Sequence, residues 1–163
     1  MQTTHRAWKY GDNVDTDLIF PGKETYTISS GPELAKYALV NLDPDFPAKV
    51  QKGDVIVAGR NWGNGSSREQ AVTCLLAAGV YAVVAASFAR IYYRNAINNG
   101  LLVIECPQAV PHIQTGDEIT LDMENSQLTC AGGTFSFPAL PESVQGIVKA
   151  GGLIAYLKQQ GIG

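Results

Sequence analysis

The sequence has few of the residues from which disulfide and metal sites are built. Its 163 residues include only three cysteines, Cys74, Cys106 and Cys130, and two histidines, His5 and His112. The cysteines lie far apart, their number is odd, and no C-x-x-C motif occurs. The sequence therefore disfavours a disulfide framework and any metal or cluster site built from this chain alone. We expect the cysteines to be core thiols and the histidines to lie at the surface or in loops.

Basic runs and long apolar runs are also missing. The net charge is −3 and no basic cluster occurs, so neither nucleic acid nor an anionic membrane is an expected partner. The longest apolar runs, such as residues 82–86, are too short to cross a bilayer. Residues 1–8 have no apolar segment of the kind found in signal peptides. We expect a cytoplasmic protein that folds as a single domain over residues 1–163.

The middle of the chain alternates between strand and helix patterns. Apolar, β-branched runs typical of buried strands occur at 54–59, 80–85 and 101–106, and helical spacing occurs at 69–78 and 88–99. Gly79 and Gly100 are the expected stops of the two helices, and Ser87 is the expected N-cap of the second. This order predicts right-handed crossovers and a parallel sheet.

The flanking segments predict a different kind of structure. Residues 3–10 have the pattern of a first strand, 32–39 of a helix and 41–52 of a loop. Residues 118–122 and 127–137 are typical of antiparallel strands joined by turns at 125–126 and 132–133. A final helical segment over 140–158 is broken at 151–152. The expected class is therefore α/β, a parallel sheet with an additional antiparallel β segment.

A glycine-rich loop at residues 59–71 carries the best candidates for chemistry. It follows a predicted strand and opens a predicted helix. Gly63 and Gly65 allow the backbone to approach a ligand closely, and Ser66 and Ser67 stand at a helix start that favours an anion. Arg68 has a planar guanidinium that can grip a carboxylate with two hydrogen bonds.

The spacing in this loop does not match the common nucleotide or hydrolase motifs. The third glycine of a dinucleotide fingerprint, the lysine of a phosphate-binding P-loop and the G-x-S-x-G of many hydrolases are all missing. A purely structural role is an equal alternative on spacing alone. In it the serines cap the helix and Glu69 bonds back to the loop.

Two further polar clusters have competing interpretations. Residues 12–17, D-N-V-D-T-D, lack the glycine and the distal glutamate of a calcium loop, so a solvated turn with Asx caps is the simpler prediction. Lys23 is either a second carboxylate-binding cation or an exposed loop lysine. The polar residues of segment 88–99 either meet a partner chain or form a solvated helix face; they are Arg90, Arg94, Asn95, Asn98 and Asn99.

Three long motifs resemble those of isopropylmalate dehydratase small subunits. They are Y-G-D-N-V-D-T-D-L-I-F-P-G at 10–22, N-W-G-N-G-S-S-R-E-Q-A at 61–71 and S-F-A-R-I-Y-Y-R-N-A-I-N-N-G-L at 87–101. The resemblance covers nearly the whole chain. It implies the swivel domain of the aconitase superfamily, a layered β/β/α fold. It also implies a large partner subunit whose own cysteines hold a [4Fe–4S] cluster, with no cofactor or metal bound by this chain.

The resemblance also implies an activity. The enzyme would isomerise 2-isopropylmalate to 3-isopropylmalate by dehydration and rehydration, a step of leucine biosynthesis. Residues 23–28 read K-E-T-Y-T-I and lack the arginine found there in many relatives. Other hydroxy di- or tricarboxylates of the homoaconitate or 2,3-dimethylmalate type therefore remain alternatives. A non-catalytic anion-binding module on the same scaffold is a further one.

The family motifs assign a role to each candidate residue. Ser66 would be the base that removes a proton, and Arg68 would stabilise its alkoxide and bind a substrate carboxylate. Asp17 would support this site and pair with a residue of the large subunit. Ser66, Arg68 and Asp17 are thus the expected catalytic residues. The expected substrate-binding residues are Gly65, Ser67, Arg68 and Lys23.

Overall fold

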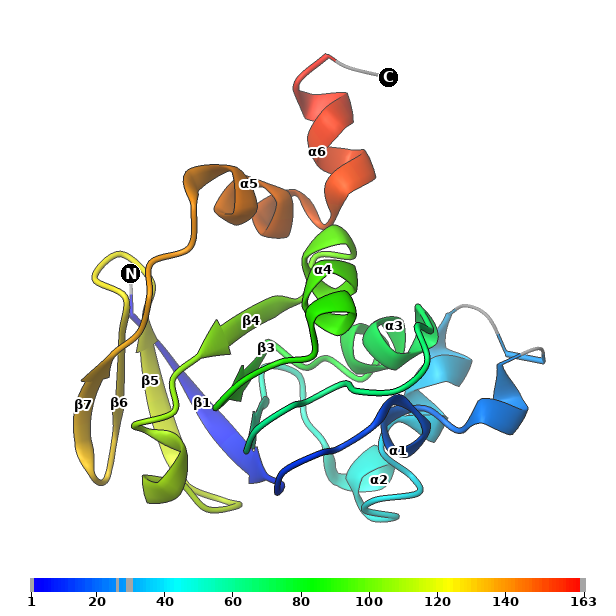
Figure 1. The fold of residues 1–163 in the computed structure, drawn as a ribbon, viewed down its shortest axis with the longest axis horizontal. Helices are drawn as coiled ribbons and strands as arrows, with labels where there is room; N and C mark the ends of the chain where they lie inside the picture. The colour runs from blue at the N-terminus through cyan, green and yellow to red at the C-terminus, as the bar shows by residue number, and fades with distance from the viewer. Residues whose placement is uncertain (1, 26, 29–30, 162–163) are drawn as a thin grey trace.

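The computed structural model describes residues 2–25, 27–28 and 31–161, which form one seven-stranded mixed sheet with helices around it (Figure 1). The strand order is β4-β3-β2-β1-β5-β6-β7. The strands are β1 Gln2–Lys9, β2 Val55–Ala58, β3 Ala82–Ala85, β4 Leu102–Glu105, β5 Glu118–Asp122, β6 Gln127–Cys130 and β7 Gly133–Ser136.

The helices alternate with the strands in the middle of the chain and follow them at its end. The α-helices are α1 Thr16–Ile19, α2 Phe46–Lys49, α3 Gln70–Ala77, α4 Arg90–Asn98, α5 Glu142–Ala150 and α6 Leu153–Gln159. Three short 3-10 helices are η1 Gly22–Glu24, η2 Pro32–Tyr37 and η3 Val110–His112. No helix in the described part of the chain has the length and apolarity needed to cross a bilayer.

Strand β1 belongs to both halves of the sheet. Its residues 7–9 pair in parallel with β2, and its residues 2–6 pair antiparallel with β5. Strands β2, β3 and β4 continue the parallel half, while β5, β6 and β7 form an antiparallel ribbon. The predicted α/β class, with a parallel sheet and an antiparallel β segment, is therefore confirmed.

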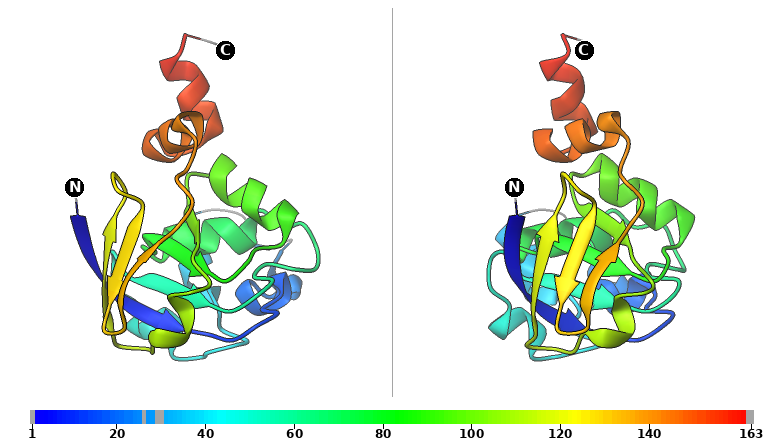
Figure 2. Two further views of the ribbon diagram at one scale, coloured as in Figure 1. Left: turned by 60° about the vertical axis from the view of Figure 1, so that its left-hand side comes forward. Right: turned by 90° about the vertical axis from the view of Figure 1, so that its left-hand side faces the viewer.

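The parallel strands are buried on both faces, which explains their continuous apolar runs. Ile56 and Val83 point into a core that contains the buried residues of α3 and α4. The alternate residues Val55 and Val84 point into a second core shared with Ile119, Leu121 and Leu128 of the antiparallel ribbon. The ribbon thus covers one face of the parallel strands and the helices cover the other (Figure 2). This is the layered β/β/α arrangement that the motifs implied.

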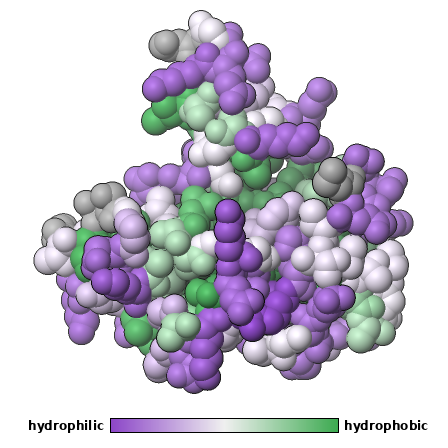
Figure 3. All heavy atoms as spheres, turned by 180° about the vertical axis from the view of Figure 1, so that it is seen from behind, coloured by the Kyte–Doolittle hydropathy of each residue, from purple (hydrophilic) through white to green (hydrophobic). Residues whose placement is uncertain are grey.

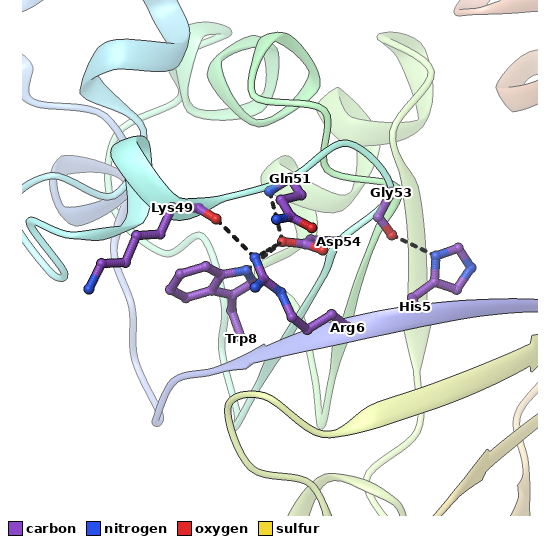
Figure 4. A network of polar contacts seen from close by, with 7 residues as sticks. All are labelled: His5, Arg6, Trp8, Lys49, Gln51, Gly53 and Asp54. Atoms are coloured by element: carbon purple, nitrogen blue, oxygen red, sulfur yellow. Dashed lines mark hydrogen bonds and ion pairs between the residues drawn. The ribbon is translucent and has the colours of Figure 1, made fainter.

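A buried carboxylate fixes the start of β2 against β1 (Figure 4). Asp54 Oδ2 accepts hydrogen bonds from Arg6 Nη2 at 2.8 Å, Trp8 Nε1 at 2.9 Å and the Gln51 N–H at 2.9 Å. Burial alone would raise the pKa of the Asp54 carboxyl, but these hydrogen bonds together hold it below its usual value. The network lies at the amino end of β2, the end opposite to the glycine-rich loop.

The expectation that both histidines lie at the surface or in loops is wrong for His5. His5 is in β1 and only 8% exposed, with its ring stacked on Tyr81 at 4.2 Å between centroids. Its Nδ1–H donates to the Gly53 carbonyl at 2.6 Å, so Nε2 accepts from the Thr3 hydroxyl at 2.7 Å. His112 is exposed, as expected, and the thiols of Cys74 and Cys106 are buried.

Three of the differences from the predicted elements concern segments 32–39 and 41–52 and the start of α4. The predicted helix at 32–39 is a 3-10 helix that ends before Leu39, whose φ of 58° cannot continue it. The predicted loop at 41–52 contains α2, because Pro47 suits a first helical turn and Phe46 packs edge-on against Trp8. Ser87 does not cap α4, which begins after Ala89; its Oγ instead accepts the Asn61 N–H at 2.8 Å.

Candidate active site

The loops that carry the three motifs meet at the carboxyl ends of the parallel strands. The Gly63 N–H donates to the Val14 carbonyl at 2.8 Å, which joins the loop after β2 to the loop after β1. The Trp62 N–H donates to the Ser87 carbonyl at 3.1 Å, which joins it to the loop after β3. This edge is where ligands bind in open parallel sheets, because loops from several strands converge there.

Two glycines make the close approach of these loops possible. Gly63 has a φ of +85°, and a Cβ there would overlap the ring of Tyr92 on α4. Gly65 has a φ of +95°, and its Cβ would lie 3.3 Å from Thr16 Oγ1. Both need the left-handed region that glycine occupies at little cost. The glycines therefore serve the packing of this loop against α1 and α4 as well as its access to a ligand.

Ser66, Ser67 and Arg68 line a cavity of about 210 Å³ between the loop and the start of α4. Thr16 closes one side, and Ile91 and other residues of α4 form the opposite side. Both serines are exposed. The volume is smaller than the roughly 300–1,000 Å³ typical of complete ligand pockets. The described chain thus forms a shallow part of a site with hydroxyl groups and one cation in it.

Only one of the two terminal nitrogens of the Arg68 guanidinium has a partner among the described residues. Its Nη2 lies 2.7 Å from Asp17 Oδ1, and its side chain is 17% exposed. Its Nη1 is buried and has no hydrogen-bond partner among the described residues. A buried guanidinium nitrogen without an acceptor is unfavourable. A ligand carboxylate on this side would remove that penalty.

Gly22 allows the Asp17–Arg68 pair to form. A Cβ at Gly22 would stand 2.7 Å from Asp17 Oδ1 and 3.2 Å from Arg68 Nη2. The first motif therefore supplies both the carboxylate that holds Arg68 and the glycine that leaves room for it. Asp17 is 63% exposed, so its outer side is open to a further partner.

The serines do not cap helix α3. The helix begins at Gln70 with Glu69 as its N-cap, and no side chain makes a capping hydrogen bond there. Ser66 Oγ has no hydrogen bond to any described residue, and Ser67 Oγ accepts only a long one, 3.4 Å, from Asn95 Nδ2. The alternative in which the serines and Glu69 form a capping box is therefore wrong. The Asx cap expected in segment 12–17 is present, since Asp15 Oδ1 accepts the Leu18 N–H at 2.9 Å.

Not every predicted residue joins the cavity. Lys23 is exposed on η1 and lies outside the cavity lining, although its neighbour Gly22 touches the Asp17–Arg68 pair. Thr16, Ile91 and Asn95 line the cavity but were not among the predicted site residues. Asn95 stood in the polar patch of segment 88–99. Only the fold brings that patch beside the serine loop.

The described residues contain no group of three or more His, Cys, Asp or Glu side chains placed to hold a metal ion. Burial raises the pKa of the Cys74 and Cys106 thiols, which disfavours the thiolate that ligates metals. The donor set of this site thus consists of hydroxyl groups and a guanidinium, which suit an anion.

Comparisons with known proteins agree with this geometry. Residues 31–109 match the family model of the aconitase C-terminal domain. The chain is 48% identical over 160 residues to the 3-isopropylmalate dehydratase small subunit of Heliobacterium modesticaldum, covering 97% of this chain and 96% of that one. It is 46% identical to the 2,3-dimethylmalate dehydratase small subunit of Eubacterium barkeri, covering 96% of this chain and 97% of that one.

A solved structure is similar over the same length. The crystal structure of a 3-isopropylmalate dehydratase from Methanocaldococcus jannaschii superposes with a TM-score of 0.91 at 42% identity. The similarity covers 99% of this chain and 96% of that one. Sequence and fold therefore indicate the same group of proteins.

Proposed function

Because the chain belongs to the family of 3-isopropylmalate dehydratase small subunits in the aconitase superfamily, we propose that it forms one half of a hydro-lyase active site. The reaction is the interconversion of 2-isopropylmalate and 3-isopropylmalate by removal and re-addition of water, a step of leucine biosynthesis. A small subunit works with a large one, so the other half of the site comes from a second chain.

One observation carries the proposal most directly. Ser66, Ser67 and Arg68 line one cavity at the edge of a parallel sheet, and Arg68 Nη1 has no hydrogen-bond acceptor among the described residues. A dicarboxylate substrate needs such a cation for one carboxylate and a base close to the carbon beside it. The cavity of about 210 Å³ is too small and open to enclose the substrate alone, which fits a site completed by another subunit.

Ser66 is the base in this account. A hydrogen on the carbon next to a carboxylate is only weakly acidic, so its removal requires a positioned base and stabilisation of the charge that develops. Ser66 Oγ is exposed and makes no hydrogen bond to a described residue, which leaves it free to meet the substrate. As an alkoxide it takes the proton to become a hydroxyl, and it returns the proton at the other carbon during rehydration.

Arg68 has two tasks. Its positive charge lowers the free energy of the Ser66 alkoxide, and its guanidinium, which lines the cavity, binds a substrate carboxylate. Asp17 orients the guanidinium through the 2.7 Å contact with Nη2. Ser67 and the Gly65 backbone bind substrate from the same loop. Lys23, exposed and outside the cavity in this chain, is a second candidate cation for a substrate carboxylate.

We expect the [4Fe–4S] cluster on the large subunit and none on this chain. When bound there, the cluster supplies a Lewis acid for the departing hydroxyl group. This chain's residues hold the carboxylate, move the proton and help to exclude water. We place the enzyme in the cytoplasm, because its three cysteines are free thiols, as in reducing compartments.

A related substrate is the main alternative. The relative from Eubacterium barkeri is named for 2,3-dimethylmalate, so closely similar chains are associated with different alkylmalates. The chemistry assigned to Ser66 and Arg68 is the same for each of these acids, since all place a hydrogen beside a carboxylate. Residues other than Ser66 and Arg68 in the assembled site must therefore select the alkyl group.

Reconstitution tests the proposal. The chain is mixed anaerobically with its cognate large subunit, and formation of the unsaturated intermediate is followed by its ultraviolet absorbance. 2-Isopropylmalate, 3-isopropylmalate, 2,3-dimethylmalate and homoisocitrate are tested in parallel. Each chain alone should be inactive, and the mixture should turn over isopropylmalate with the highest kcat/KM. Absence of turnover with every acid would overturn the proposal in favour of a non-catalytic anion-binding module.

A further inference from the structure

A second hollow lies beside the cavity, on the other flank of the amino end of α4. Its volume is about 490 Å³. Apolar side chains form much of its lining, including Phe88, Ile104 and Leu140, and Arg90 and Arg94 project from α4. Arg90 lines both the cavity and this hollow, so the two lie next to each other at the first turn of α4.

The two arginines in this hollow have no acidic partner in the described part of the chain. The three other arginines each have one: Arg6 with Asp54 at 2.8 Å, Arg60 with Asp12 at 3.6 Å and Arg68 with Asp17 at 2.7 Å. Arg90 and Arg94 are exposed and form no ion pair with a described residue, although Glu105 also lines the hollow. They are free to meet carboxylates from another molecule.

An apolar side chain lies between these arginines along the helix. Ile91 is 56% exposed, and in the described residues only Ile154 on α6 is a large hydrophobic of comparable exposure. Ile91 lines the cavity that holds Ser66 and Arg68. An exposed aliphatic side chain next to two arginines without a described acidic partner suits a protein interface, since the buried centre of an interface is apolar and Arg is enriched there.

We propose that this surface, the α4 groove formed by Arg90, Ile91, Arg94 and the hollow beside them, is a main docking site for the large subunit. The inference rests on the proposed function, because it takes the chain that completes the cavity as the occupant. That chain must approach over the first turn of α4, where Arg90 lines both the cavity and the hollow.

The chemistry of the groove defines the docking segment. It presents at least one Asp or Glu to Arg94 or Arg90 and an apolar side chain to Ile91 and to the floor at Phe88 and Leu140. Pairing the arginines with carboxylates also fixes the orientation of the two subunits around Ser66 and Arg68. Charge pairs at an interface act mainly on orientation and association rate.

Binding of the cognate, cluster-loaded large subunit tests the inference. Dissociation constants are measured anaerobically by isothermal titration calorimetry for the wild-type chain, Arg94→Glu and Ile91→Ser. Both changed residues are exposed, so the fold should persist, and circular dichroism verifies this. Lys52→Glu is the matched control. Lys52 is an exposed lysine near the amino end of β2, at the opposite edge of the parallel strands, and the substitution reverses one positive charge in the same way.

We expect Arg94→Glu to weaken binding at least tenfold and Ile91→Ser to weaken it several-fold, with Lys52→Glu unchanged. Added salt should weaken wild-type binding more steeply than Arg94→Glu binding. If both groove variants bind as tightly as the wild type while the wild-type pair turns over isopropylmalate, the docking site is wrong and the proposed function stands. If the wild-type chain neither binds nor restores activity, the proposed function fails and this inference fails with it.

Discussion

Arg68 is positioned by contacts that come from a distant part of the sequence. Asp17 fixes one nitrogen at 2.7 Å, and Gly22 leaves space for the pair. The sequence motifs identified Asp17 and Arg68 as candidate residues, but only the fold shows that their side chains are in contact. The contact depends on hydrogen bonds between loops, such as that from the Thr16 N–H to the Asn64 carbonyl at 2.9 Å. The spacing of residues in the sequence does not predict hydrogen bonds between distant loops.

Asp17→Asn is expected to reduce kcat/KM of the reconstituted enzyme about 10- to 100-fold, because a misplaced guanidinium stabilises both carboxylate and alkoxide less well. Its effect on the free energy of unfolding should stay below about 1 kcal/mol, since Asp17 is largely exposed and such pairs contribute little. Steady-state kinetics and urea unfolding measure the two effects.

Asp12→Asn is the control for this change, because Asp12 lies in the same segment as Asp17 and pairs at 3.6 Å with an arginine of the loop after β2, the exposed Arg60. It should leave kcat/KM within about threefold of the wild type, since Arg60 does not line the cavity. Equal kinetic losses in both variants would remove the positioning role of Asp17.

The side chain of Tyr92 joins the serine loop to helices α3 and α4. Tyr92 of α4 lies against Gly63, and its hydroxyl donates to the Ala71 carbonyl of α3 at 2.8 Å. The loop, α3 and α4 therefore form a single packed unit that carries the serines. Neither helix is long, so packing of this kind stabilises them more than helix propensity does.

Gly63→Ala should destabilise the protein by more than about 2 kcal/mol, because strain at positive φ adds to overlap with the Tyr92 ring. Gly53→Ala is the matched control. Gly53 has a φ of +95° but nothing within 4 Å of an added Cβ, so it should show the backbone strain alone, about 1 kcal/mol. Thermal and urea unfolding compare the two, and equal losses would mean that the ring contact is unimportant.

Helices and strands with a clear pattern of buried apolar residues could be predicted from the sequence, and short ones without it could not. The strands between residues 54 and 106 could be predicted because they are apolar on both faces, and the glycine stops of α3 and α4 were correct. The short helices α1 and α2 could not, because each has four residues and depends on tertiary contacts. Ser87 was misassigned because a serine before a helix is equally suited to bond a neighbouring loop.

The C-terminal helices α5 and α6 rise above α4 and the layered body (Figure 1), and Val144, Ile147 and Val148 of α5 pack against the first core. Neither α5 nor α6 contains a fully buried residue, and the space-filling view shows apolar and polar side chains mixed on this projection (Figure 3). The body is held together by its two cores and by the network around Asp54 and His5 at the amino ends of the strands.

His5 makes the stability of this body sensitive to acid. Burial lowers the pKa of the His5 ring below its usual value of 6.5. The unfolded chain therefore binds a proton at a pH where the folded chain does not, and stability falls as the pH drops below 6.5 towards the folded-state pKa. The lowered pKa of Asp54 adds a further loss below its usual value of 3.8. Both groups stabilise the fold fully at neutral pH.

His5→Gln should flatten the first part of this pH dependence. The variant removes the titrating ring and keeps a side-chain amide that can donate to Gly53. The free energy of unfolding, measured in urea at pH 8 and pH 5.5, should fall less between these values in the variant than in the wild type. Equal falls would show that another group controls acid stability in this range.

The central claim is that this chain contributes the proton-transferring half of a two-subunit hydro-lyase site. Turnover by the reconstituted pair with Ser66→Ala tests it most directly, with Ser143→Ala on α5, exposed and outside the cavity, as the matched control. We expect kcat to fall by about 10²- to 10⁴-fold, the usual contribution of a general base, while affinity for the large subunit and the activity of Ser143→Ala are unchanged. A kcat for Ser66→Ala within about threefold of the wild type would contradict it.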